Sequence, residues 1–362
     1  RGHSSSSTAQ HSTAHHHHRY HIMGALLCRL LGFFCSNSGC RLVADSSIWY
    51  NGAASLDSCT ESPLMMAIPS SSSSSSLLSD YLNNRIVFDT VLENFEQTET
   101  LYLVDSDTNN NTLVRNCYIH DTDLDGILLR NVQNIVVVNC TLENIGGSAA
   151  IRGSAEGSTR NVLLYNNTIR NVQQNGLSFA QRVDSDGVAV VDQVGLYIVG
   201  NDISNTGLRV GSNGLTHGMY VQAQDFFIYN NTISGIRNGN GISVRSSGVV
   251  SCNVVKDGTS KSDKPSIRYY SDHQVGPSNR LIVTKNLIDE EEHGMIDLYP
   301  PAERYDGEED RLDHVVKEFE ITNNVFVKPR DDDEEEYIRV GCEYEENVFT
   351  LVIQDNTIPT TV

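Results

Sequence analysis

Three side chains in the middle of the chain have the types and spacing to carry acid–base chemistry. They are His217, Tyr220 and Arg245, in a stretch where short apolar strings alternate with Asn- and Gly-rich turns. An imidazole with an ordinary pKa near 6.5 can accept a proton, a phenol can donate one, and a guanidinium can neutralise a carboxylate. β-Elimination beside a carboxylate needs these three functions. The chemistry therefore depends on a scaffold that brings distant residues, such as 220 and 245, into contact.

An internal repeat provides such a scaffold. Motifs such as NNTI, GNDI and KNLI recur at intervals of 22 to 38 residues. Apolar residues lie three and five positions before the central residue of most motifs and two positions after it, which predicts strand faces on either side of a turn. Units this small, with no helical stretch, must stack to bury their apolar faces, and stacking aligns the central residues in a ladder. These residues are Cys117, Cys140, Asn167, Asn201, Asn231, Asn253, Asn286, Asn324 and Asn356.

These anchored coils resemble the right-handed parallel β-helix repeat of pectate-lyase-like proteins, from about residue 85 to the end of the sequence. The resemblance implies an all-β, right-handed parallel β-helix solenoid of about nine to ten coils, which we assign to residues 81–362. Residues 1–80 are rich in Ser and His and include a serine run at 69–76. We expect them to form a disordered, low-complexity or targeting segment. Stacking leaves two possibilities for Cys117 and Cys140, neighbouring thiols or a disulfide.

The second strand of each period predicts two rows of outward side chains. One row is expected to contain Arg130, Arg152, Ala180, Gln222, Arg245, Tyr270 and Leu298, and the other Leu128, Ala150, Ser178, Tyr220, Ser243, Arg268, Ile296 and Arg339. Arginine suits carboxylate or sulfate groups, and aromatic faces suit sugar rings. We therefore expect a groove for an acidic polysaccharide, with substrate-binding residues Arg130, Arg152, Gln222, Arg268, Tyr270 and His273. The alternative is that the arginines pair with carboxylates of the protein itself.

The pectate-lyase-like resemblance covers lyases, glycoside hydrolases, uronate epimerases and non-enzymatic adhesins. Our first hypothesis is a polysaccharide lyase that cleaves an acidic uronate polymer, with His217 as base, Tyr220 as acid and Arg245 neutralising the carboxylate. A hydrolase would need paired carboxylates, for which Asp184 and Asp186 are candidates. A non-catalytic adhesive or structural β-helix is the alternative from another class. In that case His217 would only cap backbone groups in a turn.

An acidic turn, DTDLDG at residues 121–126, raises the question of a metal. Asp121, Asp123 and Asp125 place oxygen ligands at alternating positions before a glycine, as in calcium-binding turns. The twelfth position is Val132 where a helix–loop–helix calcium site needs Glu. The sequence therefore requires no cofactor but allows Ca²⁺ in a looser turn, and an acidic turn without metal is the alternative.

Charge and hydropathy restrict the partners. The net charge of −20 and pI of about 4.9 argue against nucleic acid as a partner. The sequence has no run of 18 apolar residues, so it predicts no membrane-spanning helix. We expect a monomer, located outside the cell or on the cell surface.

Overall fold

The computed structural model describes most of the repeat region and two short strands near the N-terminus. The described residues are 33–36, 39–42, 87–105, 107–183, 189–209, 211, 215–256, 264–270, 278–289, 294–299, 316, 318–327, 337–340 and 350–358. Strands dominate these ranges, and a 3₁₀ turn at Asp107–Asn109 interrupts them. His273, predicted to bind substrate, and the hydrolase candidates Asp184 and Asp186 lie outside the described residues.

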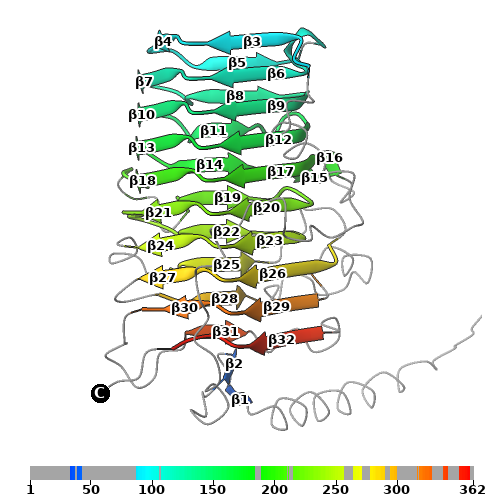
Figure 1. Cartoon of the computed structure of the whole chain (residues 1–362). Helices are drawn as coiled ribbons and strands as arrows, with labels where there is room; N and C mark the ends of the chain where they lie inside the picture. Colours follow the sequence, from blue (N-terminus) through cyan, green and yellow to red (C-terminus); the bar gives the residue numbers. More distant parts are fainter. Residues whose placement is uncertain are drawn as a thin grey trace, which may run out of the picture.

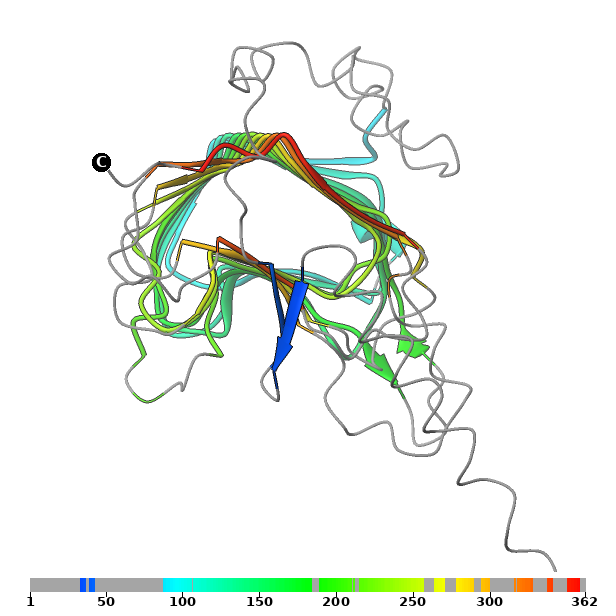
Figure 2. The same cartoon turned by 90° about the horizontal axis from the view of Figure 1, so that it is seen from below.

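Three parallel sheets form the walls of a solenoid, stacked in Figure 1 and seen end-on in Figure 2. The chain passes through sheets B, C and A in turn, and each pass makes one coil. Sheet B contains β3 (Thr90–Glu93), β6 (Thr112–Arg115), β9 (Val132–Val138), β12 (Thr159–Tyr165), β17 (Gln193–Val199), β20 (Phe226–Tyr229), β23 (Gly248–Ser251), β26 (Arg280–Thr284), β29 (Glu318–Thr322) and β32 (Thr350–Gln354).

The other two sheets complete each coil. Sheet C contains β4 (Glu96–Gln97), β7 (Tyr118–Thr122), β10 (Thr141–Ile145), β13 (Thr168–Val172), β18 (Asp202–Thr206), β21 (Thr232–Ser234), β24 (Val254–Lys256), β27 (Leu287–Asp289) and β30 (Val325–Phe326). Sheet A contains β5 (Leu101–Val104), β8 (Ile127–Arg130), β11 (Ala149–Gly153), β14 (Asn175–Phe179), β19 (Met219–Val221), β22 (Ile242–Val244), β25 (Ile267–Tyr270), β28 (Ile296–Tyr299) and β31 (Ile338–Val340). The predicted fold, a right-handed parallel β-helix of about nine to ten coils, is confirmed. A coil holds three strands, one more than the minimum of two that the sequence required.

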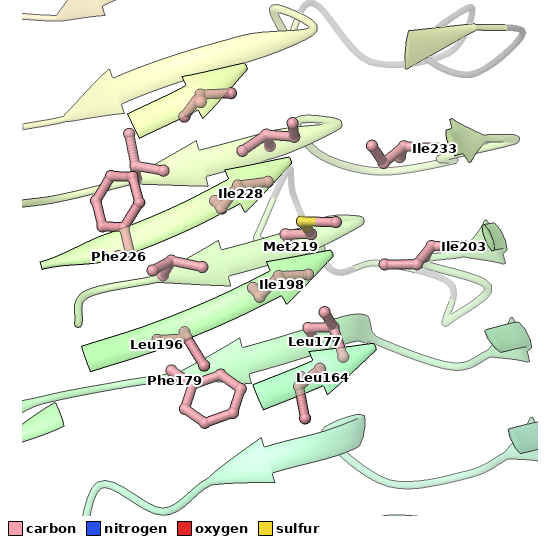
Figure 3. Close-up of a cluster of buried hydrophobic side chains, with 14 of the residues drawn as sticks. Leu164, Leu177, Phe179, Leu196, Ile198, Ile203, Met219, Phe226, Ile228 and Ile233 are labelled. Carbon is pink, nitrogen blue, oxygen red and sulfur yellow. The ribbon is translucent and has the colours of Figure 1, made fainter. Parts of the chain in front are cut away.

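Aliphatic side chains of the same type stack along the inside of the solenoid. Leu164 of β12 pairs with Ile198 of β17, which pairs with Ile228 of β20, and all three are buried (Figure 3). Alternation along each strand sends every second residue inward, so a position repeated in each coil adds one layer to a continuous core. The core therefore explains why the apolar positions around each central residue recur so regularly.

The predicted ladder of asparagines runs through the turns between sheets B and C. The side-chain Nδ2 of Asn231 donates to Oδ1 of Asn253 at 2.9 Å, and the backbone N–H of Asn231 donates to the same oxygen at 3.0 Å. The same pair of bonds links consecutive members from Asn167 to Asn356. Cys140 begins the ladder by donating its backbone N–H to Asn167 Oδ1 at 3.0 Å. Cys117 and Cys140 are buried free thiols.

A second series of asparagines lies beside this ladder and was missed by the sequence analysis. Many residues immediately before a ladder position adopt positive φ, among them Asn139 (51°), Asn166 (54°) and Asn230 (54°). Asparagine tolerates this left-handed conformation better than most residues because its short polar side chain bonds locally. Asn166 Nδ2 donates to Asn139 Oδ1 of the coil before it at 2.7 Å. The first residue of the NNT motifs at 166–168 and 230–232 is therefore set by backbone conformation.

A short N-terminal hairpin extends sheet A at the end of the stack. Strand β1 (Phe33–Ser36) pairs antiparallel with β2 (Gly39–Leu42), and β2 pairs antiparallel with β31. Figure 2 shows this hairpin crossing below the last coils. Both strands of this hairpin fall in segment 1–80, which we expected to be disordered, low-complexity or targeting, and its other residues lie outside the described ranges. Another antiparallel pair, β15 (Arg182–Val183) and β16 (Ala189–Val191), projects from the coil of β14. Within the described ranges, no helix has the length and apolar character needed to cross a membrane.

Candidate functional site

The outer face of sheet A carries the candidate residues in rows fixed by strand register. Ser178, Tyr220, Ser243, Arg268, Asp297 and Arg339 pair in succession and form one outward row. The inward residues Val221, Val244 and Tyr269 also pair in succession, so the residues after them, Gln222, Arg245 and Tyr270, form the neighbouring outward row. Tyr220 and Arg245 therefore lie on adjacent strands in neighbouring rows.

Both predicted rows of outward side chains contained register errors. Arg152 was placed with Arg130, but it pairs with Leu128 and Ser178 and belongs to the row of Tyr220. Ala150, Ile296 and Leu298 were expected to point outward, yet all three are buried core residues. The errors arose because the strands were aligned by their first apolar residue, which shifted β11 by two positions and β28 by one.

The two arginines nearest the N-terminal end of this face are neutralised by carboxylates of the protein. Arg130 Nε donates to Asp105 Oδ2 at 2.7 Å, and Arg130 also lies 3.6 Å from Glu156. Arg152 Nη1 donates to Asp125 Oδ2 at 3.1 Å. Their side chains therefore follow the alternative interpretation, in which arginines of this face pair with neighbouring carboxylates. They lie on β8 and β11, apart from the strands that carry Tyr220 and Arg245.

A buried carboxylate joins two further arginines at the other end of the face. Asp297, 1% exposed, accepts from Arg339 Nε and Nη2 at 2.8 and 2.7 Å, and Arg268 Nε lies 3.0 Å from it. Bidentate pairing of this kind gives a fixed geometry to both charges. Gln222, predicted to bind substrate, is 1% exposed, and its Oε1 accepts the backbone N–H of Gln181 at 2.7 Å. Gln222 thus supports the backbone at the A–B corner.

Arg245 has a different environment from the other arginines of this face. Its guanidinium carbon lies 5.1 Å from the ring centre of Tyr220 and 4.6 Å from that of Tyr270, between two aromatic side chains. Nε and Nη1 of Arg245 are buried without a hydrogen-bond partner. Within the described part of the chain, no carboxylate lies at ion-pair distance from Arg245. Cation–π contacts hold the guanidinium in place and leave its positive charge uncompensated.

His217 lies beside this cluster, in the turn that leads into β19. Its ring is 5% exposed and stacks on Tyr220, with ring centres 5.6 Å apart and planes inclined by 12°. The backbone N–H of Asn240 donates to His217 Nδ1 at 2.9 Å, so the proton of the neutral ring is on Nε2. Burial, and then the positive charges of Arg245, Arg268 and Lys264, lower the pKa of His217 to about 3. The imidazole is therefore neutral at physiological pH, with its basic nitrogen already occupied.

The acidic turn at residues 121–126 uses its carboxylates within the protein. Asp121 accepts from Asn144 Nδ2 at 2.8 Å and from His120 Nδ1 at 2.7 Å. Asp125 accepts the backbone N–H of Ala149 at 2.9 Å in addition to its bond from Arg152. The described residues contain no group of three His, Cys, Asp or Glu side chains that could hold a metal ion. Asp121 and Asp125 thus direct their oxygens toward protein donors, whereas Asp123 lines a pocket that Asp121 and Asn144 also line.

Asp297 and the tyrosine pair around Arg245 were the site features that the sequence analysis did not identify. Asp297 was overlooked because the strand was read one residue out of register. The two rings around Arg245 could have been predicted from the sequence. Tyr270 occupies the position of Arg245 in the next coil, and Tyr220 lies in the neighbouring outward row, one strand before Arg245. Reading both rows together would have shown the arginine between two rings.

The comparisons with known proteins agree with this architecture. Residues 70–207 match the family model of the right handed beta helix region. Neither the curated proteins nor the solved structures include a match to the chain. The three parallel sheets continue beyond the matched residues in the same order through β32. The chain therefore has the right-handed parallel β-helix fold.

Proposed function

We propose that this protein binds an acidic polysaccharide on the outer face of sheet A and cleaves it by β-elimination at Arg245. The supporting observation is the contrast among arginines in a chain of net charge −20. An aspartate pairs with each of the other four arginines of this face, Arg130, Arg152, Arg268 and Arg339. The described side-chain contacts of Arg245 are instead with two aromatic rings. Arg245 is thus the guanidinium whose charge a bound anion would balance.

A uronate unit matches this environment. Its carboxylate suits the planar guanidinium, and its ring can pack on a tyrosine face. Once Arg245 neutralises the carboxylate, the proton on the adjacent carbon becomes more acidic. A base removes that proton, a double bond forms, and the bond to the glycosidic oxygen breaks as that oxygen takes up a proton. The products are a shortened chain and an unsaturated sugar.

The geometry changes the roles that the sequence suggested for the neighbouring residues. His217 was expected to be the base, but a pKa of about 3 and an occupied Nδ1 make it a poor proton acceptor. We assign His217 to positioning, because its ring stacks on Tyr220. Tyr220 then carries the proton transfer, since its ring contacts both His217 and the guanidinium.

The test is digestion of alginate, pectate and sulfated glycans, followed by the ultraviolet absorbance of unsaturated products. Arg245→Gln is expected to lower the rate at least about 100-fold, the scale seen when one charge-stabilising donor is removed. Arg152→Gln is the matched control, an arginine of the same face that Asp125 already neutralises, and it should retain most activity. Equal activity of both variants would place the reactive site elsewhere. If no polymer is cleaved or bound by the wild-type protein, the proposal fails.

Binding without cleavage is the second candidate, and the state of His217 favours it. A buried imidazole with a pKa of about 3 and an occupied Nδ1 is a weak base, and no carboxylate in the described part of the chain forms an ion pair with Arg245. This candidate predicts retention of wild-type protein on immobilised acidic glycan, weakened by Arg245→Gln, with no gain in ultraviolet absorbance. The same digestion experiment separates the two candidates.

Our proposal includes a location outside the cell or at its surface, where such polymers occur. Cys252 is disulfide-bonded, which fits an oxidising compartment. Fractionation of the native host into secreted, surface and internal proteins, with immunodetection, tests the location. Recovery of the protein exclusively from the reducing interior would contradict it.

A further inference from the structure

Both outward side chains on strand β22 and at its end carry polar atoms that lack a partner. Ser243 and Arg245 are separated by the inward core residue Val244, so alternation places them on the same outer face of sheet A. Ser243 is 0% exposed, and its Oγ is buried with no hydrogen-bond partner among the described residues. Nε and Nη1 of Arg245 are buried in the same condition within this part of the chain. Two neighbouring side chains thus contribute three polar atoms that await a partner.

The charged neighbours of Ser243 can donate hydrogen bonds but cannot accept them. Ser243 pairs across the sheet with Arg268 of β25, and Arg245 lies two residues further along its own strand direction. A guanidinium has donors only, so neither arginine can take the serine proton. Asp297, two strands beyond Ser243 in the same row, already accepts from Arg339 and lies 3.0 Å from Arg268 Nε. The group that would satisfy both Ser243 and Arg245 is therefore an acceptor, and a negatively charged one suits the uncompensated guanidinium best.

We propose that Ser243 is a binding residue of the acidic-polysaccharide site and donates its hydroxyl proton to the anionic group that Arg245 neutralises. This assignment rests on the proposed function, but only on its binding step. A carboxylate has two oxygens, so it can accept from a guanidinium and a hydroxyl at the same time. The rings of Tyr220 and Tyr270 beside the guanidinium are partly exposed, and rotation of either ring opens a path to the buried hydroxyl.

The unpartnered hydroxyl predicts opposite effects on stability and on binding. A buried polar group without a partner destabilises a fold, so Ser243→Ala should leave the free protein as stable as wild type or more stable. The same substitution removes a hydrogen bond to a charged group of the ligand. It should therefore raise the Kd for the polysaccharide about 10- to 100-fold. A serine with a purely structural role would not combine these two effects.

Affinity electrophoresis in gels that contain pectate, alginate or a sulfated glycan measures the binding. Ser243→Ala does not change the charge of the protein, so its mobility without polymer should equal that of wild type. Ser178→Ala is the matched control, because Ser178 lies in the same outward row, two strands before Ser243. We expect the polymer to retard the control as strongly as wild type and Ser243→Ala much less. Thermal unfolding of the same proteins without polymer gives their stability.

The outcomes separate the role of Ser243 from the proposed function. Weaker binding by Arg245→Gln, together with unchanged binding by Ser243→Ala, would overturn the role of Ser243 and leave the proposed function standing. Equal weakening by Ser178→Ala and Ser243→Ala would also overturn it. A lower Tm of free Ser243→Ala would show that the hydroxyl is bonded within the protein, with the same consequence. If no polymer retards the wild-type protein, the proposed function and the role of Ser243 fail together.

Discussion

Replacement of Asn231 by alanine tests whether the asparagine ladder holds the coils together. Asn231 Oδ1 accepts the backbone N–H and Nδ2 of Asn201, each at 2.9 Å, and its Nδ2 donates to the carbonyl of Ile198 at 2.8 Å. Alanine removes these three bonds and also the two that Asn231 Nδ2 donates to the carbonyl of Tyr229 at 3.1 Å and to Asn253 Oδ1 at 2.9 Å. Asn201 Nδ2 keeps bonds to two carbonyls, but its backbone N–H loses the acceptor described here.

The cost follows from the groups that lose a partner. A buried polar group without a partner costs about 1–3 kcal/mol. With the N–H of Asn201 and the carbonyl of Ile198 affected, we expect Asn231→Ala to lower the free energy of unfolding by about 2–4 kcal/mol. At about 2–4 °C per kcal/mol for a domain of this size, Tm falls by at least about 4 °C.

Thermal and urea unfolding, followed by circular dichroism, measure this loss. The matched control is Asn238→Ala, since Asn238 is only partly buried and its Nδ2 donates to the carbonyl of Gly207 at 2.7 Å, where water can take its place. We expect the control to lose less than about 1 kcal/mol. Equal losses in the two variants would refute the reasoning that ladder bonds are special because they are buried and shared between coils.

Four further predictions concern the described side chains. Hydrogen bonds to Asp121 and Glu96 raise the pKa of His120, so its stabilising effect is complete below its unfolded pKa and is lost as the pH rises through the folded value; the Tm difference between wild type and His120→Gln should shrink from pH 5 to pH 9. His217 has the opposite sign, because its folded pKa of about 3 makes wild-type stability fall as the pH drops below about 6.5, by at most about 1.4 kcal/mol per pH unit, and His217→Gln should flatten this slope in urea titrations. Burial raises the pKa of Cys140 to about 12, so iodoacetamide at pH 8 should modify it only after unfolding, as mass spectrometry would show. Gly239→Ala places a methyl group against the carbonyl oxygen of Thr216 and 2.8 Å from His217 Nδ1, and it should lower Tm more than Gly211→Ala, where the methyl group meets nothing within 4 Å and only the φ of 84° is unfavourable.

The fold was predictable because the coils repeat the same local pattern. The spacing around Asn231 and Asn253 predicted strand, turn and strand, and stacking then predicted their contact, which the structure shows at 2.9 Å. The second asparagine series at positive φ escaped notice because the sequence pattern NNT does not say which residue bends the backbone and which one bonds between coils. The φ values of residues such as Asn166 show which asparagine of each pair has the left-handed backbone conformation.

The candidate site was less accessible to sequence reasoning. Tyr220 and Arg245 could be placed on neighbouring strands, since each follows a glycine that opens its strand. The environment of His217 depends on burial and on three charges from two later coils, and no local pattern encodes these. All four residues of β20, FFIY, are buried in the structure, but periodicity alone does not distinguish such an uninterrupted apolar string from a buried helix segment.

The asparagine ladder also bears on how such a chain can change its length. Each asparagine donates hydrogen bonds to the side-chain oxygen of the next one and accepts hydrogen bonds from the previous one. Every interior link therefore has the same donors and acceptors. Duplication or deletion of one whole coil, for example residues 231–252, would place another ladder asparagine next to the cut. Each asparagine would then still find the same donors and acceptors in the neighbouring coil. Gain or loss of complete turns is therefore a low-cost evolutionary and engineering route to a longer or shorter solenoid.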